Sequence, residues 1–198
     1  MDLILLEPGD KEFIFGGENN GYGAGGSLID TGSSDRWNFD GLEFDGQHCI
    51  ELVSVHQGMK QQLTTDVSNS ARTSGRPIVT EFTCVKYVDK TSVKFYECCL
   101  RAMPLGKNKD KPTKIYICRN SGDALANIMT FSLRDALISE IQFQSHPDDM
   151  PTEQFKLNFT EILWKYTVQL ATTDRAGNKA AGWSLMRNRP IGDFTDDK

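Results

Sequence analysis

The first pattern in this sequence that could form a functional site is the spacing of glycines near the N-terminus. Gly21, Gly23 and Gly26 match G-x-G-x-x-G, in which glycines let the backbone approach a pyrophosphate closely. The motif binds a nucleotide only between a strand and a helix, because the helix N-terminus receives the phosphates. The residues that follow, SLIDTGSSD, make a poor helix. We therefore interpret these glycines as a flexible loop and predict no nucleotide cofactor.

An Asp-Thr-Gly string lies a few residues further on. The segment from Leu28 to Ser34, followed by Trp37, resembles the active-site loop of aspartic peptidases. That chemistry needs two carboxylates about 3 Å apart that share one proton and activate a water molecule. Only one such string is present, Asp30-Thr31-Gly32, and its flanks are Gly and Asn, so a homodimer would have to supply the second carboxylate. Chance similarity in a loop is favoured, with an aspartic-peptidase-like enzyme as the alternative.

The histidines and cysteines indicate no further site. None of His48, His56 and His146 lies four residues from another, the helical spacing of zinc ligands. His48 and Cys49 are neighbours in a segment expected to be extended, so their side chains point to opposite faces and cannot act as base and nucleophile. The five cysteines include no C-x-x-C pair. The sequence therefore predicts no catalytic residue, no cofactor and no metal.

Charge and hydropathy exclude several classes of protein. The 198 residues include 22 Lys plus Arg and 27 Asp plus Glu, a net charge of −5. A nucleic-acid-binding protein needs a basic face, so we expect no nucleic-acid partner. No window of ~18 apolar residues exists, so we expect no membrane insertion. The run Leu3 to Leu6 follows Asp2 rather than a basic cluster and does not resemble a secretory signal, which predicts a cytoplasmic protein with reduced cysteines.

The elements expected around these residues are mainly strands. They are Leu3 to Leu6, Phe13 to Phe15, Ile50 to Val55, Ile78 to Val88, Lys114 to Cys118, Ile128 to Leu133, Leu137 to Phe143 and Phe155 to Val168. In the last segment the apolar residues change parity, which predicts a bulge near Thr160 or Glu161. One short helix, capped by Asp89 or Thr91, carries apolar residues as far as Leu100. The pattern predicts a mainly β fold, an antiparallel β-barrel or sandwich with one short α-helix and an extended polar loop.

Two segments depart from this pattern. Residues 17–45 are rich in Gly, Asn and Ser without sustained periodicity, which predicts a flexible insert. Residues 57–77 are polar and cannot alone repay the entropy of ordering roughly twenty residues at about 1 to 2 kcal/mol each. We expect an extended loop whose partners come from a neighbouring subunit. The domain organisation is then a single barrel over residues 1–198, with that insert and an acidic C-terminal tail at 193–198.

Five segments, taken in order, carry a family resemblance. They read MDLILLEPGD, IELVSVHQGMKQQLTTDVSNSARTSGRP, FTCVKYVDKTSV, LNFTEILWKYTVQ and AGWSLMRN. Thr-Asp-Val-Ser-Asn, Arg-Thr-Ser-Gly-x-Pro and Lys-Tyr-Val-Asp follow one another at fixed distances, a pattern longer than any chance motif. Together they resemble the Hcp family, the tube proteins of bacterial type VI secretion, over residues 2–10 and about 47–189. The insert and the acidic tail are departures from that family.

The resemblance implies a structural protein rather than an enzyme. In the family, homo-hexameric rings stack into a hollow tube that is capped by a spike protein, expelled by a contractile sheath and able to carry effectors. The resemblance also implies secretion from the bacterial cytoplasm by the type VI system without a signal peptide. The alternative from the residues alone is a monomeric β-sandwich that binds sugar or protein.

The extended loop of the family reaches around the ring, so residues 57–77 hold the candidate subunit-interface residues. They are Met59, Leu63, Thr64, Asp66, Ser68, Asn69, Arg72, Thr73 and Arg76. Strand-like residues here could add backbone hydrogen bonds along an adjacent barrel edge. The guanidinium groups of Arg72 and Arg76 could bind carboxylates of the next subunit.

Overall fold

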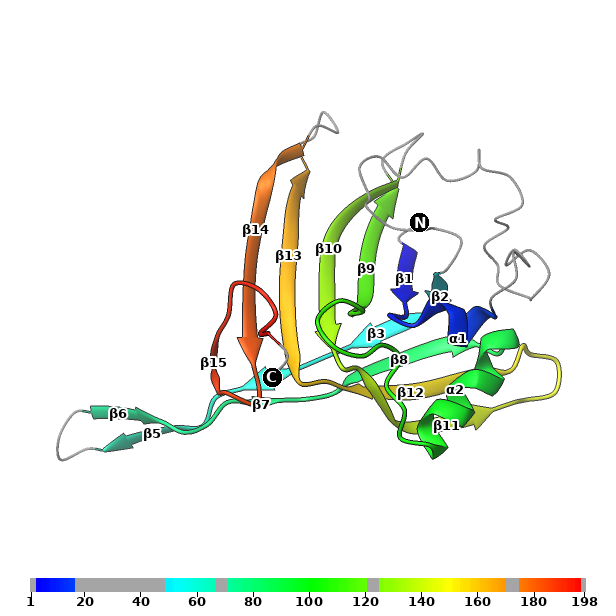
Figure 1. Cartoon of the computed structure of the whole chain (residues 1–198), viewed down its shortest axis with the longest axis horizontal. Coiled ribbons are helices and arrows are strands. Elements are labelled where there is room, and N and C mark those ends of the chain that lie inside the picture. Colours follow the sequence, from blue (N-terminus) through cyan, green and yellow to red (C-terminus); the bar gives the residue numbers. More distant parts are fainter. Residues whose placement is uncertain (1–2, 17–48, 67–70, 121–124, 170–174, 197–198) are drawn as a thin grey trace.

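The computed structural model describes residues 3–16, 49–66, 71–120, 125–169 and 175–196 (Figure 1). Its elements are β1 (Leu3–Glu7), α1 (Lys11–Phe15), β2 (Ile50–Leu52), β3 (Ser54–His56), β4 (Met59–Lys60), β5 (Leu63–Asp66), β6 (Ala71–Ser74), β7 (Ile78–Val79), β8 (Phe82–Tyr87), α2 (Lys90–Leu100), β9 (Thr113–Asn120), β10 (Leu125–Arg134), β11 (Leu137–Gln144), β12 (Thr152–Asn158), β13 (Glu161–Gln169), β14 (Arg175–Ser184) and β15 (Arg189–Pro190). The strand pairs are antiparallel. The prediction of a mainly β, antiparallel fold is therefore confirmed.

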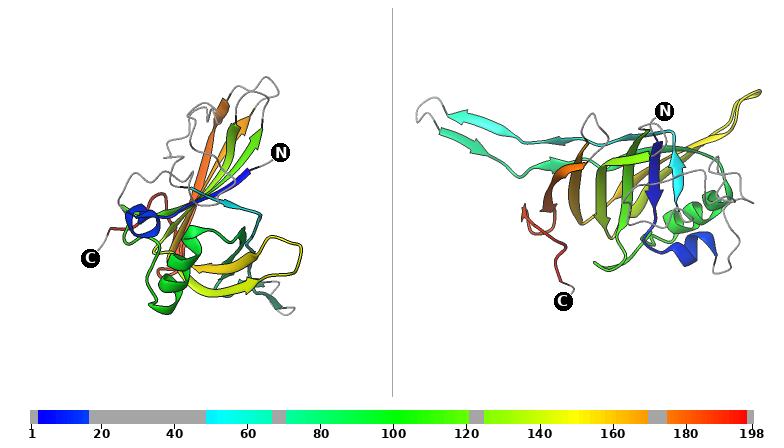
Figure 2. Two further views of the ribbon diagram at one scale, coloured as in Figure 1. Left: turned by 90° about the vertical axis from the view of Figure 1, so that its right-hand side faces the viewer. Right: turned by 90° about the horizontal axis from the view of Figure 1, so that it is seen from above.

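The strands form two packed layers and a projecting arm (Figures 1 and 2). The larger sheet has seven strands in the order β15-β14-β13-β10-β9-β1-β2, and the smaller has four in the order β11-β12-β8-β3. The pairs β4-β7 and β5-β6 belong to neither sheet. They carry the chain away from the body at one end of its long axis, whereas the connection between β11 and β12 projects at the other end.

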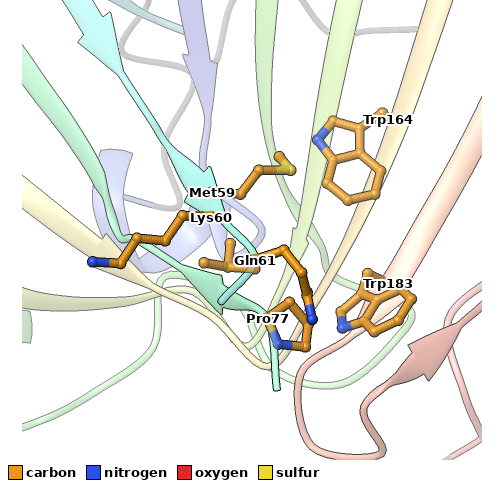
Figure 3. A pocket seen from close by; sticks show the side chains of 7 residues that line it. Met59, Lys60, Gln61, Pro77, Trp164 and Trp183 are labelled. Atoms are coloured by element: carbon orange, nitrogen blue, oxygen red, sulfur yellow. The ribbon is translucent and has the colours of Figure 1, made fainter. Parts of the chain in front are cut away.

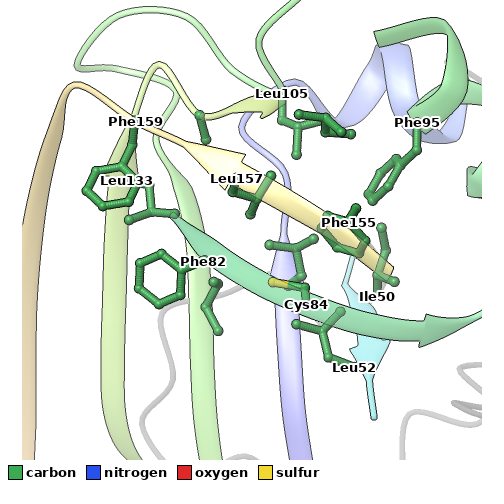
Figure 4. Packing of buried hydrophobic residues seen from close by; sticks show 14 of the residues in the cluster. Ile50, Leu52, Phe82, Cys84, Phe95, Leu105, Leu133, Phe155, Leu157 and Phe159 are labelled. Atoms are coloured by element: carbon green, nitrogen blue, oxygen red, sulfur yellow. The ribbon is translucent and has the colours of Figure 1, made fainter. Parts of the chain in front are cut away.

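The main core lies between the two sheets (Figure 4). Inward positions alternate along two neighbouring strands, Phe82 and Cys84 on β8 and Phe155 and Leu157 on β12, and all four are 1% exposed or less. Phe155 packs edge-on against Phe95 of α2, with ring centroids 5.1 Å apart. The period of two that the sequence shows in β8 thus marks its buried face.

Helix α2 begins where the sequence predicted a cap. The Asp89 carboxylate accepts a hydrogen bond from the backbone N–H of Thr91 at 2.7 Å, and the Ser92 hydroxyl accepts one from the backbone N–H of Asp89 at 3.0 Å. This reciprocal arrangement satisfies backbone donors that the start of a helix leaves unpaired. Of the two residues proposed as caps, the structure therefore selects Asp89.

A second helix, α1, replaces one predicted strand. The segment Phe13 to Phe15 is helical, and Asp10 caps it by accepting a hydrogen bond from the N–H of Phe13 at 3.4 Å. Gly16 ends the helix at a φ of +81°, which glycine adopts without steric cost. The strand prediction was wrong because a helix of five residues is too short to show a helical period.

The long apolar run predicted as one bulged strand is two strands in different sheets. Strand β12 belongs to the smaller sheet and β13 to the larger one. Between them Phe159 is buried, and the N–H of Thr160 donates to the carbonyl of Arg134 at 3.1 Å. The first apolar set is buried, whereas in the second Ile162 is buried and Tyr166 is 47% exposed. A corner between the sheets, rather than a bulge, turns the chain.

The C-terminal segment is fastened to the larger sheet. Thr195 donates to both carboxylate oxygens of Glu161, from its N–H at 3.0 Å and from its hydroxyl at 2.7 Å. Arg134 lies 3.2 Å from the same carboxylate and donates to the Thr195 hydroxyl at 2.8 Å. Lys109 forms an ion pair with Asp196. Residues 193–196, predicted to be an additional acidic tail, are thus in contact with the body of the protein.

Candidate functional site

The strings that could do chemistry lie largely outside the described residues. This holds for the glycines of 21–26, for Asp30-Thr31-Gly32, for His48 and for the insert predicted at 17–45. His56 and His146 are described, and both are exposed. Within the described ranges, no three His, Cys, Asp or Glu side chains are grouped as a metal site, and none of the helices is long and apolar enough to cross a bilayer.

The cysteines are packing residues. All five are free thiols, and four of them are buried. Burial raises the pKa of Cys84 and of Cys118 to about 12. Burial, reinforced by the nearby Glu97 charge, also raises the pKa of Cys98 to about 11. These thiols are protonated at neutral pH, so they are poor nucleophiles.

The arm is the feature that stands apart from the body. Strands β5 and β6 pair with one another from Leu63 opposite Ser74 to Asp66 opposite Ala71, and they join no other strand in the part of the chain that the structure describes. Five of the nine predicted interface residues lie on this hairpin: Leu63, Thr64, Asp66, Arg72 and Thr73. Ser68 and Asn69 lie outside the described residues. The structure thus brings most of the predicted set together on one projecting element (Figure 2).

The root of the arm is held by main-chain bonds. Strand β4 pairs with β7, and the N–H of Thr80 donates to the carbonyl of Gly58 at 2.8 Å. The Thr80 hydroxyl accepts from the N–H of Gly58 at 2.9 Å. Arg76, predicted to reach a carboxylate of the next subunit, donates to the carbonyl of Leu185 at 2.6 Å within its own chain. This contact ties the arm to the end of β14.

A groove lies between the root of the arm and the larger sheet (Figure 3). We call it the Trp groove, and it has a volume of about 390 Å³. Its lining residues are Met59, Lys60, Gln61, Pro77, Val79, Trp164 and Trp183. Trp164 and Trp183 lie on neighbouring strands, where they stand opposite Ala181 and Ile162 respectively. The small Ala181 leaves open space beside the Trp164 ring, so the two indoles form one wall.

Apolar side chains are exposed along the arm and its root. Met59 is 56% exposed and Leu63 58% exposed. Exposed apolar groups that are contiguous with an apolar groove are typical of a surface that contacts another protein. The arrangement offers main-chain edges and apolar area to a partner.

Sequence reasoning found the arm but missed the groove. Met59 was predicted as an interface residue because it is an isolated apolar residue in a polar segment. Trp164, in contrast, was interpreted only as a strand residue, and Trp183 only as part of a segment that carries the family resemblance. The signal for the groove is a tryptophan that stands opposite an alanine on the neighbouring strand, because this pair leaves an unfilled space. The sequence alone does not show this pair, since it depends on the register of β13 and β14.

The sequence matches a family of known proteins. Residues 43–166, more than half of the chain, match the family described as "Type VI secretion system effector, Hcp". The matched range includes the arm and the whole of the smaller sheet. The sequence has no detectable match among curated proteins.

Solved structures share the fold. A structure described as that of a type six secretion system protein superimposes with a TM-score of 0.66 and 19% identity, covering 79% of this chain and 95% of that one. Hcp1 from Salmonella typhimurium gives 0.62 and 16%, covering 96% and 99%. The secreted protein Hcp3 from Pseudomonas aeruginosa gives 0.52 and 11%, covering 90% and 97%. At these identities the likeness is one of fold.

Proposed function

The chain belongs to the Hcp family of type VI secretion system effectors, and from that premise we propose that six copies form a ring through the arm and that rings stack into a hollow tube. Members of this family are structural tube proteins, secreted by the type VI system, and not enzymes. The peptidase alternative and the monomeric sugar-binding or protein-binding alternative are therefore set aside. Self-assembly is the function for which a projecting arm is suited.

The observation that carries this proposal is that, among the described strands, those of the arm pair with one another and join neither of the two sheets. An isolated two-stranded hairpin is marginally stable in water, and both of its edges expose unpaired N–H and C=O groups. A neighbouring copy can satisfy those groups and cover Leu63. The nine predicted interface residues, Met59 to Arg76, are therefore kept as the proposed contact set, with Arg76 holding the arm in position.

The further partners follow from the role of the family. We expect the tube to be capped by the type VI spike protein, surrounded by the contractile sheath and able to carry effector proteins in its lumen. We also expect the chain to be made in the bacterial cytoplasm and exported without a signal peptide. These partners would contact the assembled tube and not the free subunit.

Shortening the arm tests the proposal. The N–H of Gly75 donates to the carbonyl of Gln62 at 3.0 Å, so an Asn-Gly turn can replace residues 63–74 and close the hairpin at its root. The full chain should sediment as a ring and appear as rings in electron micrographs, whereas the shortened chain should be a folded monomer. A full chain that stays monomeric at high concentration would refute the ring. A shortened chain that still forms rings would remove the arm from the contact.

A further inference from the structure

The Trp groove and the β11–β12 connection lie on opposite sides of the body and complement each other. We propose that the β11–β12 connection of a second copy docks in the Trp groove, with Phe143 and Met150 against the two indoles. This inference rests on the proposed self-assembly and specifies a contact additional to the arm. It predicts that the subunits associate head to tail.

The placement of the two surfaces permits such a contact. The groove adjoins the root of the arm on the β13–β14 side of the body, and the β11–β12 connection projects from the other side of the body (Figure 1). A ring requires a heterologous contact, in which one surface of a subunit meets a different surface of the next subunit. Two different surfaces on opposite sides of the body satisfy that requirement, because each copy then offers one of each kind.

The end of β11, which holds Phe143, and the connection, which holds Met150, carry the apolar groups that the groove could accept. Phe143 is 59% exposed and Met150 is 51% exposed. Phe143 stands opposite Glu153 in the hairpin, only three residues beyond Met150, so both apolar side chains belong to the same end. The groove volume of about 390 Å³ is at the small end of the range for protein pockets, roughly 300 to 1,000 Å³. It therefore suits one or two side chains rather than a whole element.

The charges beside the two surfaces are opposite. Lys60 lines the groove. On the connection, Asp148 and Asp149 directly precede Met150. All three charged side chains are exposed, and none forms an ion pair with another described residue. Docking would place two carboxylates beside the Lys60 ammonium at the edge of an apolar contact, an arrangement that fixes orientation and selects partners.

One polar atom in the groove also lacks a partner. The indole N–H of Trp183 is buried and donates to no acceptor within the described part of the chain. Buried donors are normally satisfied, so this one marks a surface that is incomplete in the single subunit. A docked turn brings several main-chain carbonyls to the groove, and a small adjustment of the exposed arm root would let one of them accept this hydrogen bond.

Charge reversal tests the contact in the full-length protein. One variant carries Lys60→Glu, and a second combines Asp148→Lys with Asp149→Lys. Each should weaken ring formation at least tenfold in sedimentation velocity, because like charges then meet. All three substitutions in one chain should restore the ring. Lys107→Glu, a matched reversal of an exposed lysine in the loop after α2, should change nothing.

Mixing tests the head-to-tail order. Met59→Glu blocks the groove and Phe143→Glu blocks the connection, and both residues are exposed, so both variants should fold. Each alone should lose the ring. An equimolar mixture should form a dimer that neither variant forms alone, because one intact groove then meets one intact connection.

Three outcomes would overturn the inference and leave the proposed function standing. The first is that the charge-reversed variants keep the wild-type ring, and the second is that the triple variant does not recover it. The third is that the mixture yields no dimer while shortening the arm still abolishes the ring. A wild-type chain that forms no ring at all would instead refute the proposed function, and this inference with it.

Discussion

Lys86 shows how a single charged residue can occupy a core position. It has the same parity along β8 as Phe82 and Cys84, and it is fully buried. Its ammonium lies 2.7 Å from the Glu153 carboxylate and 3.0 Å from that of Asp89. The Tyr96 hydroxyl donates to the second oxygen of Glu153 at 2.9 Å, and burial together with this carboxylate raises the pKa of Tyr96 to about 12. The network joins β8, β12 and the start of α2.

Removing one partner of the Lys86–Glu153 ion pair should lower the stability of the fold. Glu153→Ala leaves the Lys86 ammonium buried without its nearest carboxylate, so we expect a loss of about 3 to 5 kcal/mol in the free energy of unfolding. Adding Lys86→Met to Glu153→Ala should recover part of that loss, because the buried charge is then gone. Urea unfolding of the two single variants and the double variant measures the coupling. Losses that simply add would show that the ammonium and carboxylate act independently.

Leu63 offers a residue-level test of the arm. The change Leu63→Glu places a charge on an arm side chain that we expect to be covered in the ring, and it should lower the fraction of assembled protein. Leu100→Glu on α2 is the matched control, because Leu100 is even more exposed, at 88%. Sedimentation velocity at equal concentrations compares them. Equal effects of the two substitutions, or none from Leu63→Glu, would argue against burial of Leu63.

At the scale of elements, the predictable parts are those with strong local signals. Strand β8 shows its period of two, and Asp89 marks the start of α2, so both were predicted correctly. The corner between β12 and β13 produces the same change of parity as a bulge, and a local pattern cannot distinguish the two. The arm was predictable because its sequence is polar. The Trp groove was not, because it forms between segments that are distant in sequence.

The carboxylate of Glu161 links the C-terminal segment to β13, and it gives that attachment a pH dependence. Burial alone would raise the pKa of Glu161, but hydrogen bonds from Thr195, Ser184 and Arg134 outweigh burial and lower it below its ordinary value. A carboxyl group with a lowered pKa in the folded state stabilises the fold above its unfolded-state pKa. That stabilisation is lost as the pH falls through the folded-state value.

Glu161→Gln should therefore lower the unfolding temperature less at acid pH than at pH 7, because the wild-type protein loses its stabilising carboxylate as the pH falls through the lowered pKa of Glu161. Both proteins are compared in the arm-shortened chain, so that assembly does not contribute to their thermal unfolding. A difference between wild type and variant that stays constant down to the acid limit of folding would show that ionisation of Glu161 does not stabilise the attachment.

At the scale of the whole molecule, the arm at one end and the β11–β12 connection at the other make the single subunit an incomplete structure. Apolar area on Met59, Leu63, Phe143 and Met150 faces solvent until a neighbour covers it. The free energy of unfolding should therefore rise with protein concentration, because neighbouring copies bind the folded subunit and not the unfolded chain.

This dependence can be measured without any substitution in the contacts themselves. For a six-subunit ring, a hundredfold rise in concentration should stabilise each subunit by about 2 kcal/mol and raise the unfolding temperature by about 5 °C. The arm-shortened chain should unfold at the same temperature at every concentration, because it has no assembled state to favour. Scanning calorimetry over that range compares the two proteins. If the full-length chain were equally insensitive to concentration, its fold would be complete without neighbours, and the arm would need a partner other than a second copy.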